Sequence, residues 1–179
     1  ITGYTMIKVA ICDDDIQFIY KLEQSIFRFA EMKRIKVDVD GYTSGAEFIQ
    51  QLQQSERYDL LFLDIELGAS SGIIVGNWIR SQIQYESMQI VFVSAKEMYA
   101  MQLFDLRPMN FLVKPIQQER VDYILDEYER LYQFQPHIIE IGKGRNSIRI
   151  EEHSVFYLQS LARKIQVVTA NDILSVSYT

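Results

Sequence analysis

Residues 7–15 read IKVAICDDD, a short apolar run from Ile7 to Cys12 that ends in three consecutive aspartates. An apolar run of this length, rich in Val and Ile, is typical of a β-strand that is covered on both faces. Four more apolar runs follow, and amphipathic stretches separate them. The four runs are Lys36 to Tyr42, Leu60 to Leu63, Gln89 to Val93 and Asn110 to Val113. This alternation predicts βαβ units, and so an α/β fold with a five-stranded, doubly wound parallel sheet.

Five helices are expected in the gaps. The first carries apolar residues at three- and four-residue spacing, and the second opens with Ser44 and Glu47, a capping box that satisfies backbone donors at a helix start. Apart from that second helix, the predicted spans are about Asp15 to Met32, Gly72 to Ile83, Glu97 to Phe104 and Gln118 to Tyr132.

The chain changes in character after Tyr132. Gln133 to Pro136 is typical of a linker, and strand-like runs follow it: Ile138 to Ile141, Ser147 to Ile150, Val155 to Leu158 and Ile165 to Thr169. We therefore predict an α/β domain over residues 6–132 and a mostly-β domain over residues 137–179. Ile1 to Thr5, before Met6, is interpreted as an expression remnant and is left out of the fold argument.

The composition is that of a globular protein, with 48% hydrophobic and 23% charged residues. A net charge of −6 argues against the whole chain being a stand-alone nucleic-acid binder, because phosphate contacts need clustered Lys and Arg. Cys12 is the single cysteine and is expected in the core. No window approaches the roughly 18 apolar residues of a membrane span, so we expect no membrane partner and a cytoplasmic location.

Reactive side chains follow four of the five predicted strands. The acids at positions 13–15 follow the first strand, Asp64 the third, Ser94 the fourth, and Lys114 the fifth. In an open parallel sheet, ligands bind at the carboxyl ends of the strands, so these groups should share one edge. The chain therefore predicts a single site that contains several carboxylates, a hydroxyl and an ammonium group.

Carboxylates that converge in this way repel one another unless a divalent cation neutralises them, and Mg²⁺ prefers such oxygen ligands. A carboxylate can also accept a phosphoryl group as a nucleophile when a metal and a fixed cation stabilise the charge. The pattern thus favours Asp64 as phosphoacceptor, with Lys114 as the cation and Ser94 as a hydrogen-bonding partner. The alternative is structural, because Asp or Ser after a strand is commonly a helix cap and a Lys-Pro pair is often only a loop. The joint placement of these groups favours the functional interpretation.

The sequence resembles the receiver family of two-component signalling over essentially all of residues 6–132. The matching residues are Asp13 and Asp14 after the first strand, Asp64 within Leu61-Phe62-Leu63-Asp64, Gly72, Ser94 followed by Ala95, and Lys114 before Pro115. The resemblance implies a flavodoxin-like sheet with strand order 2-1-3-4-5. It also implies a cis bond before Pro115, and Gly68 departs from the family by standing where many receivers carry proline.

The same resemblance implies a role for each site residue. Asp64 becomes the phosphoacceptor. Mg²⁺ is held by Asp14 directly, by Asp64 and the backbone carbonyl of Glu66, and by Asp13 largely through water. Lys114 pairs with the phosphoryl group and Ser94 senses it, while Phe111 is the switching aromatic residue. Phe111 is equally compatible with a plain core position.

The second segment resembles the opening strands of a LytTR-type DNA-binding domain, as found in LytR/AgrA-family regulators. The residues that carry this likeness are 139–144, 147–150, 155–158 and 165–169. The resemblance implies DNA contacts from the loop Ser160 to Lys164, where Arg163 and Lys164 are the candidates, with Arg145 and Asn146 beside them. These charges are also compatible with solvated turns. A domain of modal size needs about 100 residues and this segment supplies about 43, so we expect an incomplete domain.

We therefore predict a transcriptional response regulator that is not an enzyme beyond self-phosphorylation from small phosphodonors and slow autodephosphorylation. The resemblance implies a sensor histidine kinase as phosphodonor, promoter DNA as target if the second domain is complete, and a homodimer on phosphorylation. Two alternatives stay open. One is a receiver-like scaffold that never takes phosphate, and the other is a phosphatase-like hydrolase that uses Asp64 and Glu66.

Overall fold

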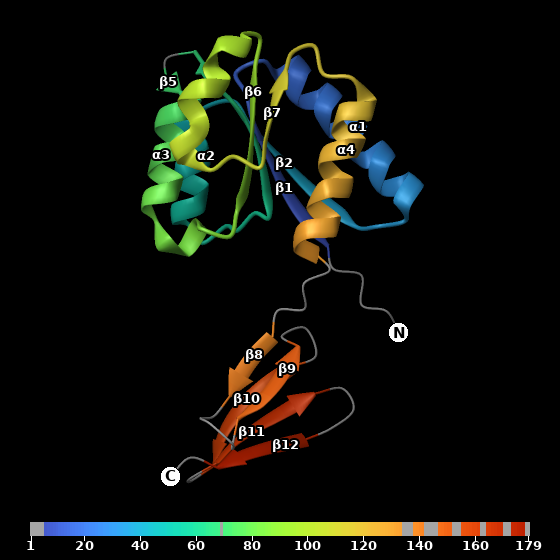
Figure 1. Ribbon diagram of the computed structural model, residues 1–179, viewed down its shortest axis with the longest axis vertical. Helices are drawn as coiled ribbons and strands as arrows, with labels where there is room; N and C mark the ends of the chain where they lie inside the picture. Colours follow the sequence, from blue (N-terminus) through green and yellow to red (C-terminus); the bar gives the residue numbers. More distant parts are fainter. Residues whose placement is uncertain are drawn as a thin grey trace. The chain divides into compact units, whose positions relative to one another are not determined.

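A computed structural model describes residues 6–68 and 70–133 and, further along, residues 138–141, 147–151, 155–161, 164–169 and 173–177. The chain divides into two compact units, Ile1–Tyr128 and Glu129–Thr179 (Figure 1). Each unit is described separately below.

The first unit is built on a parallel sheet of five strands. Its order is β2-β1-β3-β6-β7, so the expected sheet and the implied strand order are both confirmed. The strands are β1 (Ile7–Cys12), β2 (Val37–Tyr42), β3 (Leu60–Asp64), β6 (Gln89–Ser94) and β7 (Asn110–Val113). β1 and β3 are almost entirely buried, as their apolar runs predicted, and Cys12 lies in the core.

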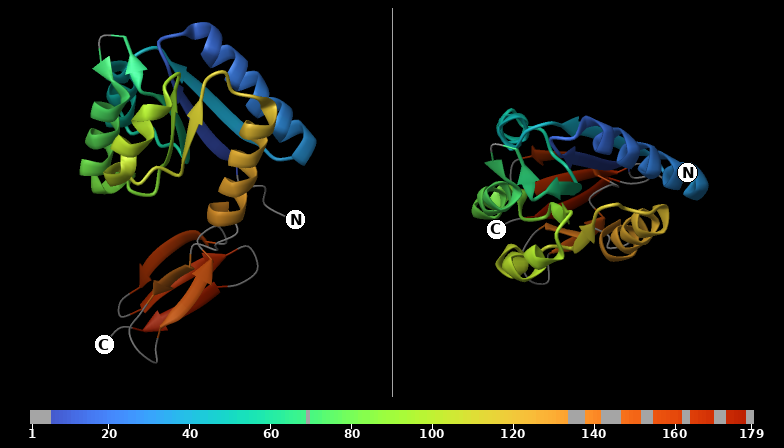
Figure 2. Two further views of the ribbon diagram at one scale, coloured as in Figure 1. Left: turned by 45° about the horizontal axis from the view of Figure 1, so that its top comes forward. Right: turned by 90° about the horizontal axis from the view of Figure 1, so that it is seen from above.

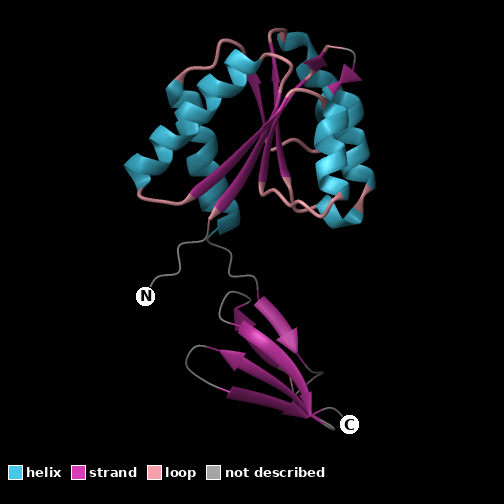
Figure 3. Ribbon diagram, turned by 180° about the vertical axis from the view of Figure 1, so that it is seen from behind, coloured by secondary structure: helices cyan, strands magenta, loops and turns pink. Residues whose placement is uncertain are grey.

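Helices cover both faces of this sheet. They are α1 (Ile16–Lys33), α2 (Gly45–Gln53), α3 (Gly72–Ser81) and α4 (Gln118–Tyr128). Figures 2 and 3 show α1 and α4 side by side on one face, and α2 and α3 on the other. Asp15 caps α1 by accepting the N–H groups of Gln17 and Phe18, and Ser44 caps α2 through the N–H of Glu47.

The segment between β6 and β7 differs from its prediction. It is a ten-residue 3₁₀ helix, η2 (Glu97–Leu106), rather than an α-helix. Apolar spacing over so short a stretch does not separate 3.0 from 3.6 residues per turn, and the side chain of the N-cap residue, Lys96, makes no capping hydrogen bond. The guanidinium of Arg80, on α3, donates to the carbonyls of Leu106 and Met88 at 2.9 Å each and so ties the end of η2 to α3.

Other boundaries differ as well. α3 ends at Ser81 and is followed by a 3₁₀ turn, η1 (Ile83–Tyr85), and α4 ends at Tyr128 in a π-helical turn, η3 (Glu129–Gln133). A small hairpin was not predicted, because its strands, β4 (Glu66–Leu67) and β5 (Ser70–Ser71), are too short to show an alternating pattern.

The second unit is mostly β, as predicted. β8 (Ile138–Ile141) pairs with β9 (Ile148–Glu151), and an antiparallel sheet contains β10 (Val155–Leu161), β11 (Lys164–Thr169) and β12 (Ile173–Ser177). β12 was not predicted. Side chains from both sheets form one small apolar cluster of Ile141, Ile150, Val167 and Val176.

The expected DNA-contact loop from Ser160 to Lys164 is shorter than predicted. Ser160 pairs with Ile165 and Leu161 with Lys164, so β10 and β11 extend closer to the turn than their apolar runs indicated. Lys164 is therefore the first residue of β11, and its side chain is exposed. Arg145, Asn146 and Arg163 lie outside the described residues.

Candidate functional site

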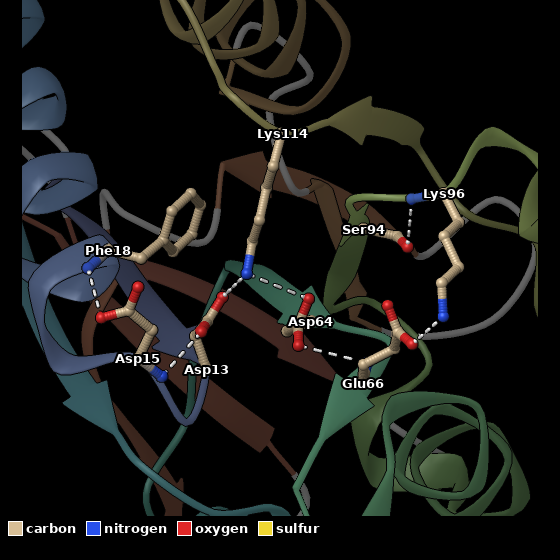
Figure 4. Close-up of polar contacts among 8 residues, drawn as sticks. All are labelled: Asp13, Asp15, Phe18, Asp64, Glu66, Ser94, Lys96 and Lys114. Carbon is tan, nitrogen blue, oxygen red and sulfur yellow. Dashed lines mark hydrogen bonds and ion pairs between the residues drawn. The ribbon is translucent and has the colours of Figure 1, made fainter.

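The carboxyl ends of β1, β3, β6 and β7 bring the predicted polar groups to one edge of the sheet. Among the residues that the structure describes, the buried polar or charged side chains are Asp13, Asp64 and Ser94, and all three stand at this edge. Lys114 reaches into the same place from the end of β7 (Figure 4). The strand-end pattern in the sequence therefore located the cluster correctly.

The ammonium of Lys114 joins two of the carboxylates. Its Nζ atom donates to Oδ2 of Asp13 at 2.6 Å and lies 3.2 Å from Oδ1 of Asp64, while the ring of Phe18 stands 4.2 Å away. Burial disfavours the charged form of Lys114, but the hydrogen bond to Asp13 and the charges of both acids outweigh it, so its pKa is raised. Lys114 is a fixed cation, and its bond to Pro115 is cis, as the resemblance implied.

At Asp64 the surroundings favour the neutral form of the side chain over the charged form. Its Oδ2 atom accepts the backbone N–H of Glu66 at 3.1 Å and its Oδ1 atom faces Lys114. Burial raises the pKa of Asp64, the negative charge of Asp13 raises it further, and Lys114 opposes both effects without cancelling them. One lysine therefore does not fully neutralise the carboxylates of this site.

The acids can supply oxygen ligands to a cation. Asp13, Asp14 and Asp64 each offer a carboxylate oxygen, and these oxygens lie within 4.8 Å of one another. Hard oxygen donors in a small acidic cluster match the preference of Mg²⁺. The donor set thus fits the magnesium ion that the sequence predicted, and Asp14 is its exposed member.

Two glycines shape the turns beside the acids. Gly68 lies between β4 and β5 with φ +54°, and a Cβ there would stand 3.1 Å from Oδ2 of Asp14. Proline is confined to φ near −65°, so it could not adopt the backbone conformation of Gly68. The turn therefore requires a residue other than the proline that many receivers carry here. A Cβ on Gly72 would lie only 2.0 Å from the carbonyl oxygen of Asp64, so α3 can begin against β3 only with glycine here.

A second polar group lies on the other side of Asp64. Oγ of Ser94 accepts the backbone N–H of Lys96 at 3.0 Å, and Nζ of Lys96 lies 2.5 Å from Oε1 of Glu66 (Figure 4). The ion pair thus connects β4, which follows β3, with the loop after β6.

A family comparison matches this geometry: the model of the response regulator receiver domain covers residues 9–126. The chain belongs to the response regulator receiver family. The matched residues include most of β1, the acids at its end, Asp64, Ser94 and Lys114.

Several relatives have a similar sequence. LytT, a sensory transduction protein from Bacillus cereus, is 28% identical over 172 residues, which cover 96% of this chain and 65% of that protein. LytR from Streptococcus agalactiae is 30% identical over 126 residues, 70% of this chain and 49% of that protein. The chain therefore spans from about half to just under two thirds of these curated relatives. The match to LytT continues through the C-terminal strands, consistent with a LytTR-type region.

Solved structures agree on the fold. The response regulatory domain of mrkE from Klebsiella pneumoniae has a TM-score of 0.62 at 24% identity, with 72% of this chain and all of that chain covered. A CheY-like receiver domain from Methylobacillus flagellatus has a TM-score of 0.59 at 21% identity, with 70% of this chain and all of that chain covered. Among the described residues, each helix is either too short or too polar to span a lipid bilayer.

The sequence did not single out every residue at the receiver's site. Lys96 was missed, and Glu66 was named only for its backbone carbonyl and for the hydrolase alternative, although each stands two residues after a predicted site residue, Asp64 or Ser94, on adjacent strands. That matched spacing was the available signal. Phe111 is partly buried and packs against the core cluster, so its switching role stays a prediction.

Proposed function

We propose that this chain acts as a two-component response regulator, which accepts a phosphoryl group on Asp64 from a sensor histidine kinase and controls transcription. The observation that carries the proposal is the placement of Asp64 at the end of a buried strand, between the Lys114 cation and the N–H of Glu66, beside Asp13 and Asp14. This arrangement offers a nucleophile together with the charge that phosphoryl transfer requires.

In the proposed transfer, an oxygen of Asp64 forms a bond to phosphorus while the bond between phosphorus and the histidine nitrogen of the kinase breaks. The product is an acyl phosphate. Lys114, which already lies 3.2 Å from Asp64, would pair with a phosphoryl oxygen. Asp13, Asp14, Asp64 and the carbonyl of Glu66 would hold Mg²⁺, which neutralises charge on the transferred group when bound.

The signal would leave the site through Ser94. Its hydroxyl oxygen now accepts the N–H of Lys96, and its own proton is available to a phosphoryl oxygen. A shift of Ser94 would displace the loop that leads into η2, and Phe111 would follow as the switching residue. We propose that this population shift favours a homodimer and lets the LytTR-type region bind promoter DNA, with Arg145, Asn146, Arg163 and Lys164 as contacts.

Intact-mass measurement after treatment with acetyl phosphate tests the site. The wild-type chain should gain one phosphoryl group in the presence of Mg²⁺ and none after chelation, and Asp64→Asn should gain none. Asp15→Asn is the matched control, because Asp15 caps α1 and Asn can also cap a helix. Phosphate incorporation by Asp64→Asn at the wild-type level would refute the assignment.

The same measurement separates the alternatives. A scaffold that never takes phosphate would show no mass gain in the wild-type chain and no Mg²⁺ binding by calorimetry. A hydrolase would turn over a phosphate ester continuously instead of taking up one equivalent. The ion pair between Glu66 and Lys96 disfavours the hydrolase, because it already engages the side chain that would have to serve as the acid.

A further inference from the structure

Strand β2 forms an open edge of the receiver sheet. It pairs with β1 on one side, and no strand of the described residues pairs with it on the other. The carbonyls of Lys36, just before β2, and of Tyr42, its last residue, accept N–H groups from the β1 side. Because backbone groups alternate in direction along a strand, the N–H and C=O groups of Val37, Val39 and Gly41 point away from β1. β2 therefore offers free backbone donors and acceptors to an added strand.

One face of this edge is acidic. Asp38 and Asp40 are two residues apart in β2, so their side chains share a face of the sheet. The hydroxyl of Tyr58 donates to Oδ2 of Asp40 at 2.7 Å, and the ring of Tyr58 contacts Phe48, so this is the face that α2 covers. The hydrogen bond orients Asp40, while 42% of its side chain stays exposed. The edge thus presents one oriented carboxylate with a second one beside it.

The acids at this edge outnumber the cation beside them. Nζ of Lys8, on β1, lies 2.6 Å from Oε2 of Glu56 and 4.0 Å from Oδ2 of Asp40. The hydrogen bond to Glu56 raises the pKa of Lys8 against the effect of burial, and the charges of Glu56, Asp40 and Asp38 raise it further. Among these four side chains, three carboxylates face one ammonium group. The acidic face therefore keeps an excess of negative charge.

These charges disfavour a second copy of the chain as the occupant of the edge. If two copies of β2 paired antiparallel about Val39, Asp38 of each copy would stand opposite Asp40 of the other. Like charges directly opposite each other in an antiparallel pair are destabilising, whereas opposite charges stabilise it. Charge complementarity therefore favours a partner strand that carries cationic side chains at these two positions.

The other face of the edge is apolar. Val37 and Val39 share this face with Gly41, where a Cβ would stand 2.6 Å from Cγ2 of Ile19 on α1. A strand added here would therefore need apolar side chains between its cationic ones.

We propose that β2 is a docking edge for an extended basic segment of a partner protein, which adds to the sheet as an antiparallel strand. Lysine or arginine side chains of the segment lie opposite Asp38 and Asp40, and apolar residues alternate with them. In this mode of recognition, main-chain hydrogen bonds supply affinity and alternate side chains supply specificity. The inference does not depend on phosphorylation of Asp64.

Titration of the full chain with the peptide acetyl-Thr-Val-Lys-Val-Lys-Val-Thr-amide, followed by NMR, tests the docking edge. With its central valine opposite Val39, the two lysines stand opposite Asp38 and Asp40. Binding should be saturable, and the amides of Val39 and Gly41 should exchange more slowly with solvent in the complex. N-methylation of the central valine, whose N–H faces β2, should abolish binding. N-methylation of both lysines, whose N–H groups face away, should leave binding intact although the charge is the same.

Variants of the chain test the charges. The D38N/D40N double variant should weaken binding by about two- to thirty-fold, the range that two cross-strand charge pairs can supply. Asparagine keeps an acceptor for the Tyr58 hydroxyl, and thermal unfolding confirms that the variant is folded. The matched control is E31Q/E119Q, which removes two exposed carboxylates from α1 and α4 and should leave the affinity unchanged.

Four results would overturn the docking edge. They are absence of saturable binding, equal binding by the peptide methylated at its central valine, equal weakening by the matched control, and slower exchange at amides away from β2. Dimerisation of the peptide-free chain with the amides of Val39 and Gly41 protected would identify a second copy as the occupant. That result would overturn the basic segment as well.

Discussion

Asp64 is held in surroundings that make its carboxyl group harder to ionise. Burial and the neighbouring charge of Asp13 both raise its pKa, and Lys114 only partly compensates. A carboxylate in this position destabilises the fold, because the folded protein binds the proton more tightly than the unfolded chain does. The same features leave the oxygens of Asp64 poorly solvated beside a cation, which suits a nucleophile.

Asp64→Asn should therefore stabilise the receiver domain. In the absence of Mg²⁺ and near neutral pH, the free energy of unfolding should rise by an amount on the order of 1 kcal/mol, because a repelled charge is removed. With a raised folded-state pKa, the wild-type penalty is complete above that pKa and vanishes as the pH falls below the ordinary value of aspartate. The advantage of the variant should thus shrink toward about pH 4. Urea denaturation of wild type and Asp64→Asn, near neutral pH and near pH 4, measures the difference in the free energy of unfolding. A stabilisation that is larger at the acidic pH would contradict this prediction.

Lys114→Met should have the opposite effect on stability. Asp13 and Asp64 would stay buried without their shared cation, and the free energy of unfolding at neutral pH should fall by about 2–3 kcal/mol. Addition of Mg²⁺ should restore part of this loss. Lys33→Met, which breaks an exposed ion pair, should lower the free energy of unfolding by less than about 1 kcal/mol. Equal losses in the two variants would show that Lys114 is not the main counter-charge.

At the scale of single residues, the sequence located most of the site because polar groups at strand ends must meet at one edge of a parallel sheet. Asp13, Asp64, Ser94 and Lys114 were found in this way. The ion pair between Glu66 and Lys96 was missed because it depends on the side-by-side placement of β3 and β6, and two charged residues carry no such signal alone.

The elements differ in how well their residues determine them. The buried strands were predicted to within a residue or so, since continuous apolar runs bounded by charge have few other interpretations. η2 was expected as an α-helix, and its residues alone do not reveal its contacts with other elements, such as the hydrogen bond that Arg80 of α3 donates to Leu106. The β4–β5 hairpin carries no pattern apart from its glycine at φ +54°.

Arg80→Met should loosen η2. The two carbonyls at 2.9 Å lose their charged donor, so the free energy of unfolding should fall by about 2 kcal/mol and the amides of η2 should exchange faster with solvent. Hydrogen exchange resolved by peptide mass spectrometry measures this effect. Arg107→Met is the control, because its side chain makes an exposed pair with Glu86 at 3.2 Å. Uniformly faster exchange throughout the sheet would contradict a local role for Arg80.

Gly68→Ala should weaken metal binding more than it weakens the fold. The left-handed φ and the 3.1 Å approach to Asp14 both oppose a side chain, and the turn can relax only by displacement of that carboxylate. We expect a loss of about 1 kcal/mol in stability and a several-fold weaker affinity for Mg²⁺, measured by calorimetry. An unchanged Mg²⁺ affinity would show that Asp14 tolerates the displacement.

At the scale of the whole molecule, the two units have very different cores. The first encloses a sheet covered on both faces, whereas the apolar cluster among the described residues of the second contains Ile141, Ile150, Val167 and Val176. The alternation of strands and helices predicted the first architecture, but its strand order followed only from the family resemblance, because several orders satisfy the same pattern. The C-terminal strands were predicted from runs separated by turns, and β12 was missed.

A polypeptide of residues 6–133 should therefore fold alone, with a single cooperative transition and unchanged phosphate uptake. A polypeptide of residues 129–179 should not, because a chain near 50 residues rarely buries enough apolar surface to offset its conformational entropy. Circular dichroism and thermal unfolding of the two fragments test this prediction. A cooperative transition in the shorter fragment would refute it.

The helix type of η2 also determines the shape of the surface that it presents. Met98, Met101 and Phe104 are strongly exposed and three residues apart. At about 120° per residue in a 3₁₀ helix, they stand in one straight ridge. Rewinding to an α-helix, at about 100° per residue, would turn each by about 60° relative to the one before and spread the ridge into a spiral. A change of winding in this one segment would thus rearrange the exposed apolar surface of the receiver domain. Every strand of the sheet would stay in register.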